Sequence, residues 1–290
     1  MQSPNVTSGS AREILIQPSR GFRFLDVREL IAYRDLLGLL VWRDFATRYK
    51  QTLLGPLWHI FQPLLTTVIF TVVFSIVAKL PTDGLPPTLF YLCGLLAWNY
   101  FSQTFTSTSS TLTANAGLFG KVYFPRLIVP LAAVVSNVIS FLIQLGAFLT
   151  VLVIYRLTHP NVHVGPRWEA ILLVPVVLLH LATFGLGVGL WLAALTAKFR
   201  DFAVLSGFIL QLWLYVTPVI LPLARVPAEY HFIVGLNPVT LPVECMRYLL
   251  LGTGWINPSL LLISIASTLL TVTSGILIFR EVERTFVDVV

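Results

Sequence analysis

The sequence has few charged residues and only two cysteines. Charged side chains make up 11% of its 290 residues, whereas hydrophobic side chains make up 56%. Because soluble domains carry about 25% charged residues, this composition excludes a soluble protein and indicates an integral membrane protein. Cys93 and Cys245 match no metal-binding or redox spacing, and we interpret both as packing residues.

The apolar segments of the chain also lack charge. No Asp, Glu, Lys or Arg lies inside the six segments defined below, and the only imidazoles there are His59 and His180. Carriers that are coupled to protons or ions usually place ionisable groups at mid-membrane. The sequence therefore disfavours such coupling, although sodium held by backbone carbonyls stays open.

The chain has no nucleotide-binding motif of its own. Residues 117–122 (GLFGKV) come closest to a phosphate-binding loop, but the first glycine is too near the second, and Val122 replaces the required Ser or Thr. Residues 185–190 (GLGVGL) miss the dinucleotide-binding pattern. We therefore predict that the chain is not an enzyme and binds no cofactor, so that a separate protein must hydrolyse ATP if this one pumps.

The chain is organised around residues 35–78. Apolar residues recur at every fourth position of 35–51: Leu37, Val41, Phe45 and Tyr49. This spacing, with basic residues on the other side, predicts an amphipathic helix lying on an anionic membrane surface; a soluble helix is the alternative. Gly55-Pro56 predicts a change of direction. Residues 57–78 are then long enough, at about 1.5 Å per residue, to cross a hydrocarbon core of about 30 Å.

The predicted fold class is an all-α integral membrane protein with six transmembrane helices. They cover residues 57–78, 89–105, 127–154, 171–195, 202–221 and 258–279. Residues 222–257 contain four prolines and apolar pieces too short to span. They predict a re-entrant pair of helices on the outer side, with a plain extramembrane loop as the alternative. The predicted domains are a polar segment 1–34, an interfacial helix 35–56, a six-span domain 57–279 and a tail 280–290.

The basic residues predict the orientation in the membrane. Residues 1–34 have no apolar core of the signal-peptide type, so we expect the N-terminus to stay in the cytoplasm. Six crossings then place most of the 19 Lys and Arg residues in cytoplasmic segments, as the positive-inside rule requires. Both termini are therefore predicted to be cytoplasmic. The same asymmetry explains the net charge of +6 without a nucleic-acid partner.

Three motifs carry a resemblance to a known family. They are Arg43-Asp44 with RYKQTLLGPLW at 48–58, GLFGKVYFPR at 117–126, and KFRDF at 198–202. Over about residues 30–279 the chain resembles the permease subunits of ABC exporters for bacterial surface polysaccharides, the O-antigen and teichoic-acid class. The resemblance implies pairing with a second copy and with two ATP-binding cassette subunits, which hold ATP and Mg. It also implies a lipid-linked polysaccharide as substrate and the bacterial cytoplasmic (inner) membrane as location.

Aromatic residues of the second predicted span are candidates for the translocation path. They are Tyr91, Trp98, Phe101 and Phe105. Aromatic faces can contact the C–H edges of sugars, and the hydroxyls of Ser102, Thr106 and Ser109 continue toward the cytoplasm. The alternative is that these aromatics pack against neighbouring helices or lie at the membrane interface, where Trp and Tyr are enriched.

Three basic residues on the polar side of 35–51 are candidates for a cytoplasmic substrate entrance. They are Arg43, Arg48 and Lys50. The lipid carrier of a polysaccharide bears phosphate, and arginine can donate two hydrogen bonds to phosphate. The favoured alternative is anchoring to anionic lipid, worth about 1 kcal/mol per basic residue.

Two further sets of residues are predicted to make contacts. The loop 115–126 is predicted to contact the ATPase through Phe119, Lys121, Tyr123, Phe124 and Arg126. Exposed aromatic residues favour a partner surface; folding back on the membrane interface is the alternative. The fourth span carries a strip of small residues, Gly185, Gly189 and Ala193, which predicts close packing with a helix of the same chain or of a second copy.

Three other functional classes remain, and the sequence does not separate the first of them from the polysaccharide permease. A permease of the same architecture that moves drugs or lipids would also use aromatic residues and a basic inner rim. A membrane-embedded transferase would need a constellation of His, Asp or Glu in the spans, and Glu244 with Arg247, one turn apart, is typical of a local ion pair instead. A passive channel would not explain the aromatic loop.

Overall fold

The computed structural model of the protein describes residues 27–50, 55–119, 124–162 and 164–286, and no strand occurs in these ranges. The helices begin with α1 (Val27–Ala32), α2 (Arg34–Tyr49), the 3₁₀ turn η1 (Gly55–Leu57), α3 (Trp58–Phe70), the π-helix η2 (Thr71–Val77), α4 (Pro87–Ser109), α5 (Thr111–Ala114), α6 (Ala116–Phe119) and α7 (Ile128–Thr158). They continue with η3 (Ile171–Leu173), α8 (Val174–Lys198), α9 (Asp201–Val216), η4 (Leu223–Arg225), η5 (Ala228–Tyr230), α10 (His231–Gly235), α11 (Thr240–Leu251) and α12 (Pro258–Phe286).

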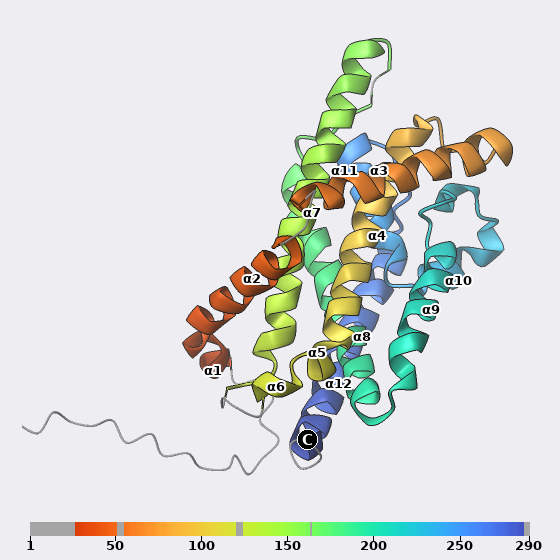
Figure 1. Ribbon diagram of the computed structural model, residues 1–290. Coiled ribbons are helices and arrows are strands. Elements are labelled where there is room, and N and C mark those ends of the chain that lie inside the picture. Colours follow the sequence, from red (N-terminus) through yellow and green to blue (C-terminus); the bar gives the residue numbers. More distant parts are fainter. Residues whose placement is uncertain (1–26, 51–54, 120–123, 163, 287–290) are drawn as a thin grey trace, which may run out of the picture.

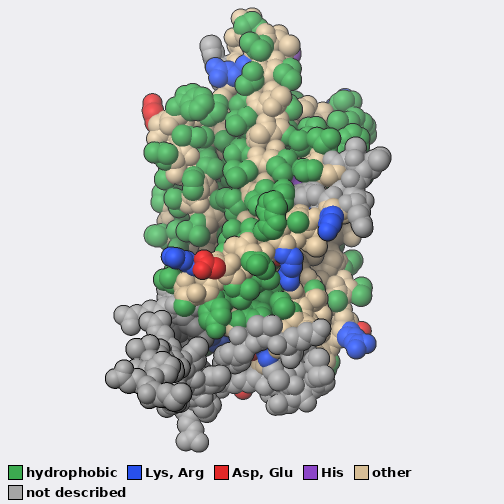
Figure 2. Space-filling view, turned by 60° about the vertical axis from the view of Figure 1, so that its left-hand side comes forward, with side chains coloured by type: hydrophobic (Ala, Val, Ile, Leu, Met, Phe, Trp, Pro, Cys, Tyr) green, Lys and Arg blue, Asp and Glu red, His purple; other side chains and the backbone are tan. Residues whose placement is uncertain are grey.

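Four long helices, α4, α7, α8 and α12, form the central bundle, with α9 on one side and α2 lying obliquely across α7 on the other (Figure 1). By length and composition, four helical segments of the described chain could cross a membrane: Gly55–Val77, Ile128–Thr158, Ile171–Lys198 and Pro258–Glu283. Figure 2 shows apolar side chains over the upper half of one face, between charged groups near the top and others about halfway down. An apolar belt between two charged levels is what a bilayer requires.

Helix α4 lies at the centre of the core. Every residue from 89 to 98 is buried, and this half of the helix packs among α7, α8 and α11. From residue 99 onward, buried and half-exposed positions alternate at helical spacing. One side of the second half of α4 therefore packs against the bundle, and the other side is accessible.

The small residues of α8 pack against helices of the same chain. A Cβ added at Gly185 would lie 3.1 Å from Thr104 Cγ2 of α4, and one at Gly189 would lie 2.5 Å from Thr108 Cβ of α4. Ala193, one turn further, is buried beside Phe279 of α12. Within this chain, the strip of small residues therefore faces α4 and α12.

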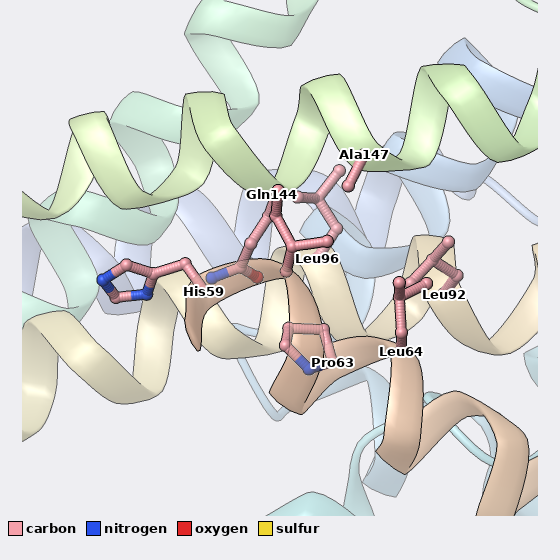
Figure 3. A pocket seen from close by; sticks show the side chains of 8 residues that line it. His59, Pro63, Leu64, Leu92, Leu96, Gln144 and Ala147 are labelled. Carbon is pink, nitrogen blue, oxygen red and sulfur yellow. The ribbon is translucent and has the colours of Figure 1, made fainter. Parts of the chain in front are cut away.

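The first predicted span forms a continuous helix, but its direction differs from that of the bundle. In Figure 1 the segment α3–η2 runs across α4 and α7, and Figure 3 shows α3 crossing the same two helices at close range. Only Pro63 and Thr67 of α3 are buried, and η2 has no buried residue. Few contacts within the chain therefore fix this orientation. The turn expected at Gly55 is present, with a φ of +51° that favours glycine.

The fifth predicted span is shorter than expected. The sequence predicts a helix over residues 202–221, whereas α9 ends at Val216. Pro218 explains the difference, because a proline disfavours helical geometry at the preceding residue, and Thr217 is indeed extended with ψ 141°. Three other spans extend at least four residues further than predicted: α4 and α7 each extend four residues beyond their predicted ends, and α12 extends seven residues beyond 279, so that most of the predicted tail 280–290 is helical.

Residues 222–257 contain two helices separated by turns, as the prolines predict. Helix α10 has five residues and α11 has twelve. Glu244 and Arg247 of α11 form the expected ion pair at 2.9 Å, and both side chains are at most 2% exposed. Arg247 also donates hydrogen bonds to the carbonyls of Pro218 and Val219, while Glu244 accepts from the amides of Leu223 and Trp255. The pair therefore joins α11 to the ends of α9 and α12.

Helix α2 packs on α7 through a face centred on Leu40. Leu40 is buried with Phe124, Ile128, Val129 and Ala132, and Leu37 and Val41 of the predicted stripe lie at the edge of this cluster. Trp42 of α2 is 69% exposed. The apolar residues of α2 thus divide between a face that contacts the protein and a face that contacts the surroundings.

Candidate functional site

A groove with a volume of about 590 Å³ opens between α2, α3, α4, α7 and α9. Its lining residues are Arg48, His59, Gln62, Pro63, Trp98, Asn99, Ser102, Gln103, Thr106, Ser107, Gln144, Leu210, Gln211 and Leu214. Sites for small molecules typically measure about 300–1,000 Å³, so the groove has the size of a binding site.

Helix α4 supplies one side of the groove through residues that recur every three or four positions. These are Trp98, Asn99, Ser102, Gln103, Thr106 and Ser107. The hydroxyls do not interrupt the helix, because Thr106 Oγ1 donates to Ser102 O at 2.8 Å and Ser107 Oγ donates to Gln103 O at 2.8 Å. Such bonds to the preceding turn satisfy Ser and Thr inside a helix. The amides of Asn99 and Gln103 project from the same face.

Hydrogen bonds join this face to α7 along a line that we call the polar seam. Asn99 Nδ2 donates to Gln144 Oε1 at 3.1 Å, and Asn137 Nδ2 donates to Ser107 Oγ at 3.0 Å. Ser140 Oγ lies 3.3 Å from His59 Nε2 of α3. The seam therefore connects α3, α4 and α7 with uncharged polar groups.

A second, much smaller cavity of about 10 Å³ adjoins the groove. It shares His59, Pro63 and Gln144 with the groove, and its other lining residues are apolar: Ile60, Leu64, Leu92, Leu96 and Ala147. Figure 3 shows Gln144 extending from α7 into the space between α3 and α4, close to Leu96. The Gln144 amide thus lies where the polar groove meets the apolar core.

The chemical character of the groove is polar and uncharged, with one guanidinium. Five primary amides line it: Gln62, Asn99, Gln103, Gln144 and Gln211. The described residues that line the groove include no Asp or Glu and a single arginine, Arg48. A primary amide can donate and accept hydrogen bonds at once. The groove can therefore bind hydroxyl-rich molecules and can hold an anionic group near Arg48.

The four aromatic residues predicted to line a path are all buried in the core, and one of them also lines the groove. Tyr91, Phe101 and Phe105 have no exposed surface. The Phe101 ring stacks on Phe184 at 5.6 Å and contacts Trp213 at 5.2 Å. For these three residues, the structure corresponds to the packing alternative. Trp98 contacts Phe101 at 5.4 Å and is 5% exposed, and it lines the groove.

The three basic residues predicted at the entrance also separate. Arg48 lines the groove. Arg43 instead pairs with Asp44 at 2.8 Å and donates to Asn115 Oδ1 at 3.2 Å, which connects α2 to the start of the loop 115–126. Lys50 is exposed at the end of α2. Of the three, Arg48 is the residue that the structure brings to the groove.

The predicted coupling loop is folded against α2 and α12 where it is described. Phe124 is buried and lies 5.9 Å from Phe119, and the Arg126 guanidinium lies 5.4 Å from the Phe119 ring. Arg126 also donates to the carbonyl of Glu283 at 2.9 Å. Lys121 and Tyr123 lie outside the described residues.

The amides are the residues that the sequence analysis missed. A signal was present in the spacing of these residues. In α4, Asn99, Gln103 and Ser107 recur every four residues. In α7, Asn137, Ser140 and Gln144 follow one another at spacings of three and four residues. Polar residues that keep helical spacing inside apolar segments indicate a shared face. Because amides are neither charged nor aromatic, a prediction based on charged groups and aromatic residues does not select them.

Comparison with known proteins gives a consistent result. The profile of the family described as ABC-2 type transporter matches residues 35–251. The O-antigen export system permease protein RfbA of Myxococcus xanthus is 33% identical over 215 residues, which is 73% of this chain and 79% of that protein. RfbA of Klebsiella pneumoniae is 26% identical over 255 residues, 88% and 95% of the two chains. The polysialic acid transport protein KpsM of Escherichia coli is 22% identical over 244 residues, 83% and 91% of the two chains.

Proposed function

The chain belongs to the ABC-2 type transporter family, and we propose that it is the permease subunit of an exporter that moves a polysaccharide across the cytoplasmic membrane of a bacterium. The names of the relatives, which are permeases for O-antigen export and a transport protein for polysialic acid, support a polysaccharide substrate. The observation that carries the proposal is the groove, because it brings Trp98, Arg48 and the amides together at one surface.

In this proposal the chain crosses the membrane six times, with both termini in the cytoplasm. The crossings are α3 with η2, α4, α7, α8, α9 and α12, while α2 lies at the inner surface and residues 222–257 form the re-entrant pair on the outer side. Because α3 with η2 lies across the bundle in the structure, its crossing requires that it turn to run along α4 and α7, and the few contacts that it makes within the chain favour such a change. The four long apolar segments and the apolar belt in Figure 2 support this arrangement. Helix α9 has 16 residues, so the turn that follows it must complete that crossing.

The groove is proposed to hold part of the exported glycan. Arg48 would receive the phosphate of a lipid-linked substrate at the cytoplasmic end, and Trp98 would contact sugar rings further along. A groove that is open on one side needs a second surface to enclose a polymer, and α3 exposes Phe61 and Leu65 beside it. A second copy of the chain is the proposed partner at this side.

The loop 115–126 and α2 are proposed to transmit the motion of two ATP-binding cassette subunits to the groove. The bond from Arg43 to Asn115 and the shared cluster around Leu40 and Phe124 join the loop to α2, and Arg48 lies in the last turn of α2. A displacement of the loop would therefore move Arg48. Phe119, Lys121, Tyr123, Phe124 and Arg126 remain the proposed coupling residues.

A permease for drugs or lipids is the alternative within the same architecture. Drug-binding and lipid-binding sites are predominantly apolar, whereas ten of the groove's lining residues, led by its five amides, carry polar side chains. This lining favours a hydroxyl-rich substrate.

ATP hydrolysis by the reconstituted protein tests the proposal. The chain would be purified in lipid alone and after co-expression with a candidate ATPase encoded beside it, each with and without a lipid-linked glycan. We expect hydrolysis only in the complex, with a rate that changes when the glycan is added. A chain that forms no complex with an ATPase would contradict the proposal. The Phe119 ring is only half-buried. The variant Phe119→Ser should therefore weaken the association with the ATPase without the core defect expected of a change at Phe124.

A further inference from the structure

Five amide side chains converge on the groove from four helices. Gln62 belongs to α3, Asn99 and Gln103 to α4, Gln144 to α7 and Gln211 to α9. We propose that these amides form a binding subsite for the hydroxyl groups of uncharged sugar rings, with Asn99 and Gln144 at its centre. The inference rests on the proposed function, because it assigns the substrate contacts of the same groove.

The pairing of amides with sugar hydroxyls follows from their hydrogen-bonding groups. A hydroxyl donates one hydrogen bond and accepts others, and a primary amide offers both a carbonyl acceptor and two N–H donors. One amide can therefore bind two neighbouring hydroxyls of a ring, or one hydroxyl in either role. Charged side chains lack this versatility, since a carboxylate only accepts and an ammonium only donates.

The Asn99–Gln144 bond gives the subsite a satisfied state when no sugar is present. Asn99 Nδ2 donates to Gln144 Oε1 at 3.1 Å, and Gln144 is only 5% exposed. A sugar hydroxyl that enters between them replaces one bond with two others of similar kind. Exchanging hydrogen bonds in this way has a small net effect on free energy. Binding is then weak enough for the ring to leave, which conduction requires.

The position of Trp98 supports the same ligand. Trp98 precedes Asn99 in α4 and lines the groove with it. The indole offers an apolar surface for the C–H face of a ring while the amides contact the hydroxyls around the ring's edge. Ser102 and Thr106 continue the polar line on the same helix face at spacings of four residues.

The distribution of charge sets the class of glycan. Among the described residues that line the groove, Arg48 is the strong cation, and it comes from α2. The lining residues that α4, α7 and α9 contribute include no Lys or Arg. The subsite therefore suits neutral sugar rings, and an acidic ring is stabilised only near Arg48.

Binding of maltoheptaose, an uncharged oligosaccharide, to the purified full-length chain in lipid nanodiscs tests the inference. Tryptophan fluorescence reports binding, and the variant Trp98→Phe identifies the part of the signal that comes from the groove. We expect saturable binding by the wild type. The double variant Asn99→Leu/Gln144→Leu should raise the Kd about tenfold, because two hydrogen-bonding groups are lost.

The matched control is Asn161→Leu, which makes the same change at an exposed residue in the turn after α7. It should bind as the wild type does. If the double variant does not fold, Gln211→Leu replaces it, because Gln211 is exposed on α9 and its change should raise the Kd about threefold without loss of packing.

The outcomes separate the subsite from the proposed function. A wild-type exporter complex that exports polymer, together with a folded double variant whose Kd is unchanged, overturns the subsite and leaves the function in place. The same is true if the wild type shows no saturable binding of maltoheptaose. A wild-type complex that exports no polysaccharide overturns the function and the subsite with it.

Discussion

The two halves of α4 use polar chemistry in opposite ways. Residues 89–98 are buried on all sides, and the Arg247 guanidinium lies 3.9 Å from the Phe90 ring and within 3 Å of the place where a Cβ at Gly94 would be. Residues 99–107 instead present Asn99, Gln103 and Ser107 to a groove. One half is enclosed around a buried ion pair, and the other half lines an accessible surface with neutral groups.

The two halves of α4 differ in whether the polar groups beside them can exchange hydrogen-bond partners. Glu244 and Arg247 are paired with each other and with four backbone groups of the segments after α9 and before α12. A buried pair of this kind has no substitute partner, because removing one charge leaves the other uncompensated. The amides of the groove can exchange partners at small cost. The first half therefore fixes the fold, and the second half is suited to contacts that form and break.

The largest effect is expected at the ion pair. Arg247→Met leaves the Glu244 carboxylate buried without its partner, which should destabilise the protein by about 3–5 kcal/mol. Thermal unfolding of the purified protein, with the yield of monodisperse protein on size exclusion, measures this loss. The double variant Glu244→Leu/Arg247→Met should recover part of the stability, because it removes the unpaired charge but leaves four backbone groups without their side-chain partners. Wild-type stability in the single variant would show that the two halves of α4 are not distinguished in this way.

The next largest effect on stability is expected where α8 packs against the second half of α4. In Gly189→Ala the new Cβ would lie 2.5 Å from Thr108 Cβ and 3.1 Å from the carbonyl oxygen of Phe105. Such overpacking should cost about 1–3 kcal/mol, seen as a lower unfolding temperature. Gly146→Ala on α7 is the matched control, since its Cβ would meet nothing within 4 Å. Equal behaviour of the two variants would mean that this face of α4 is not tightly packed.

The aromatic residues of α4 sharpen the comparison, because Trp98 lines the groove whereas Phe105 does not. Phe105→Leu removes ring contacts in the core and should lower stability by about 1 kcal/mol while the remaining folded protein exports normally. Trp98→Leu should also lower stability by about 1 kcal/mol, because Trp98 is only 5% exposed, but in addition it should reduce export by the folded protein about fivefold, as expected for the loss of about 1 kcal/mol of substrate contact. Export by reconstituted complexes and thermal unfolding measure the two effects. The assignment fails if Trp98→Leu exports at the wild-type rate.

The smallest effect is expected at the charged end of the groove. Arg48→Ala should raise the apparent KM for a lipid-linked substrate about fivefold, since one contact to phosphate is worth about 1 kcal/mol. Lys50→Ala, two residues away and exposed outside the groove, should leave the KM unchanged. Identical KM values in the two variants and the wild type would leave Arg48 with membrane anchoring alone.

The sequence predicted the parts of the fold that depend on local chemistry. Apolar length, the turn at Gly55 and the proline-rich interruption after α9 are visible along the chain, and α7, α8 and α12 begin within three residues of their predicted starts. The glycine spacing in α8 predicted close packing, because small residues at helical spacing leave room for a neighbour. The identity of that neighbour, α4, depends on tertiary contacts that the spacing does not contain.

The candidate site was predicted less completely for the same reason. Trp98 and Phe101 are three residues apart and equally suited to sugars by type, but one faces the groove and the other packs on Phe184. Their separation depends on how α4 is rotated in the bundle. Asn99 and Gln144 meet across two helices that are far apart in the sequence. Hydrophobic periodicity determines that such helices form, but it does not determine which polar faces meet.

Photo-crosslinking from a groove position and from a buried position of α4, in cells that export polymer, tests the central claim most directly. A photoreactive amino acid would be placed at Ser102, which lines the groove, or at Phe105, which is buried and does not line the groove. We predict that the polymer is crosslinked from position 102 and that position 105 crosslinks only within the protein. Polymer crosslinked from position 105 and not from position 102 would contradict the account.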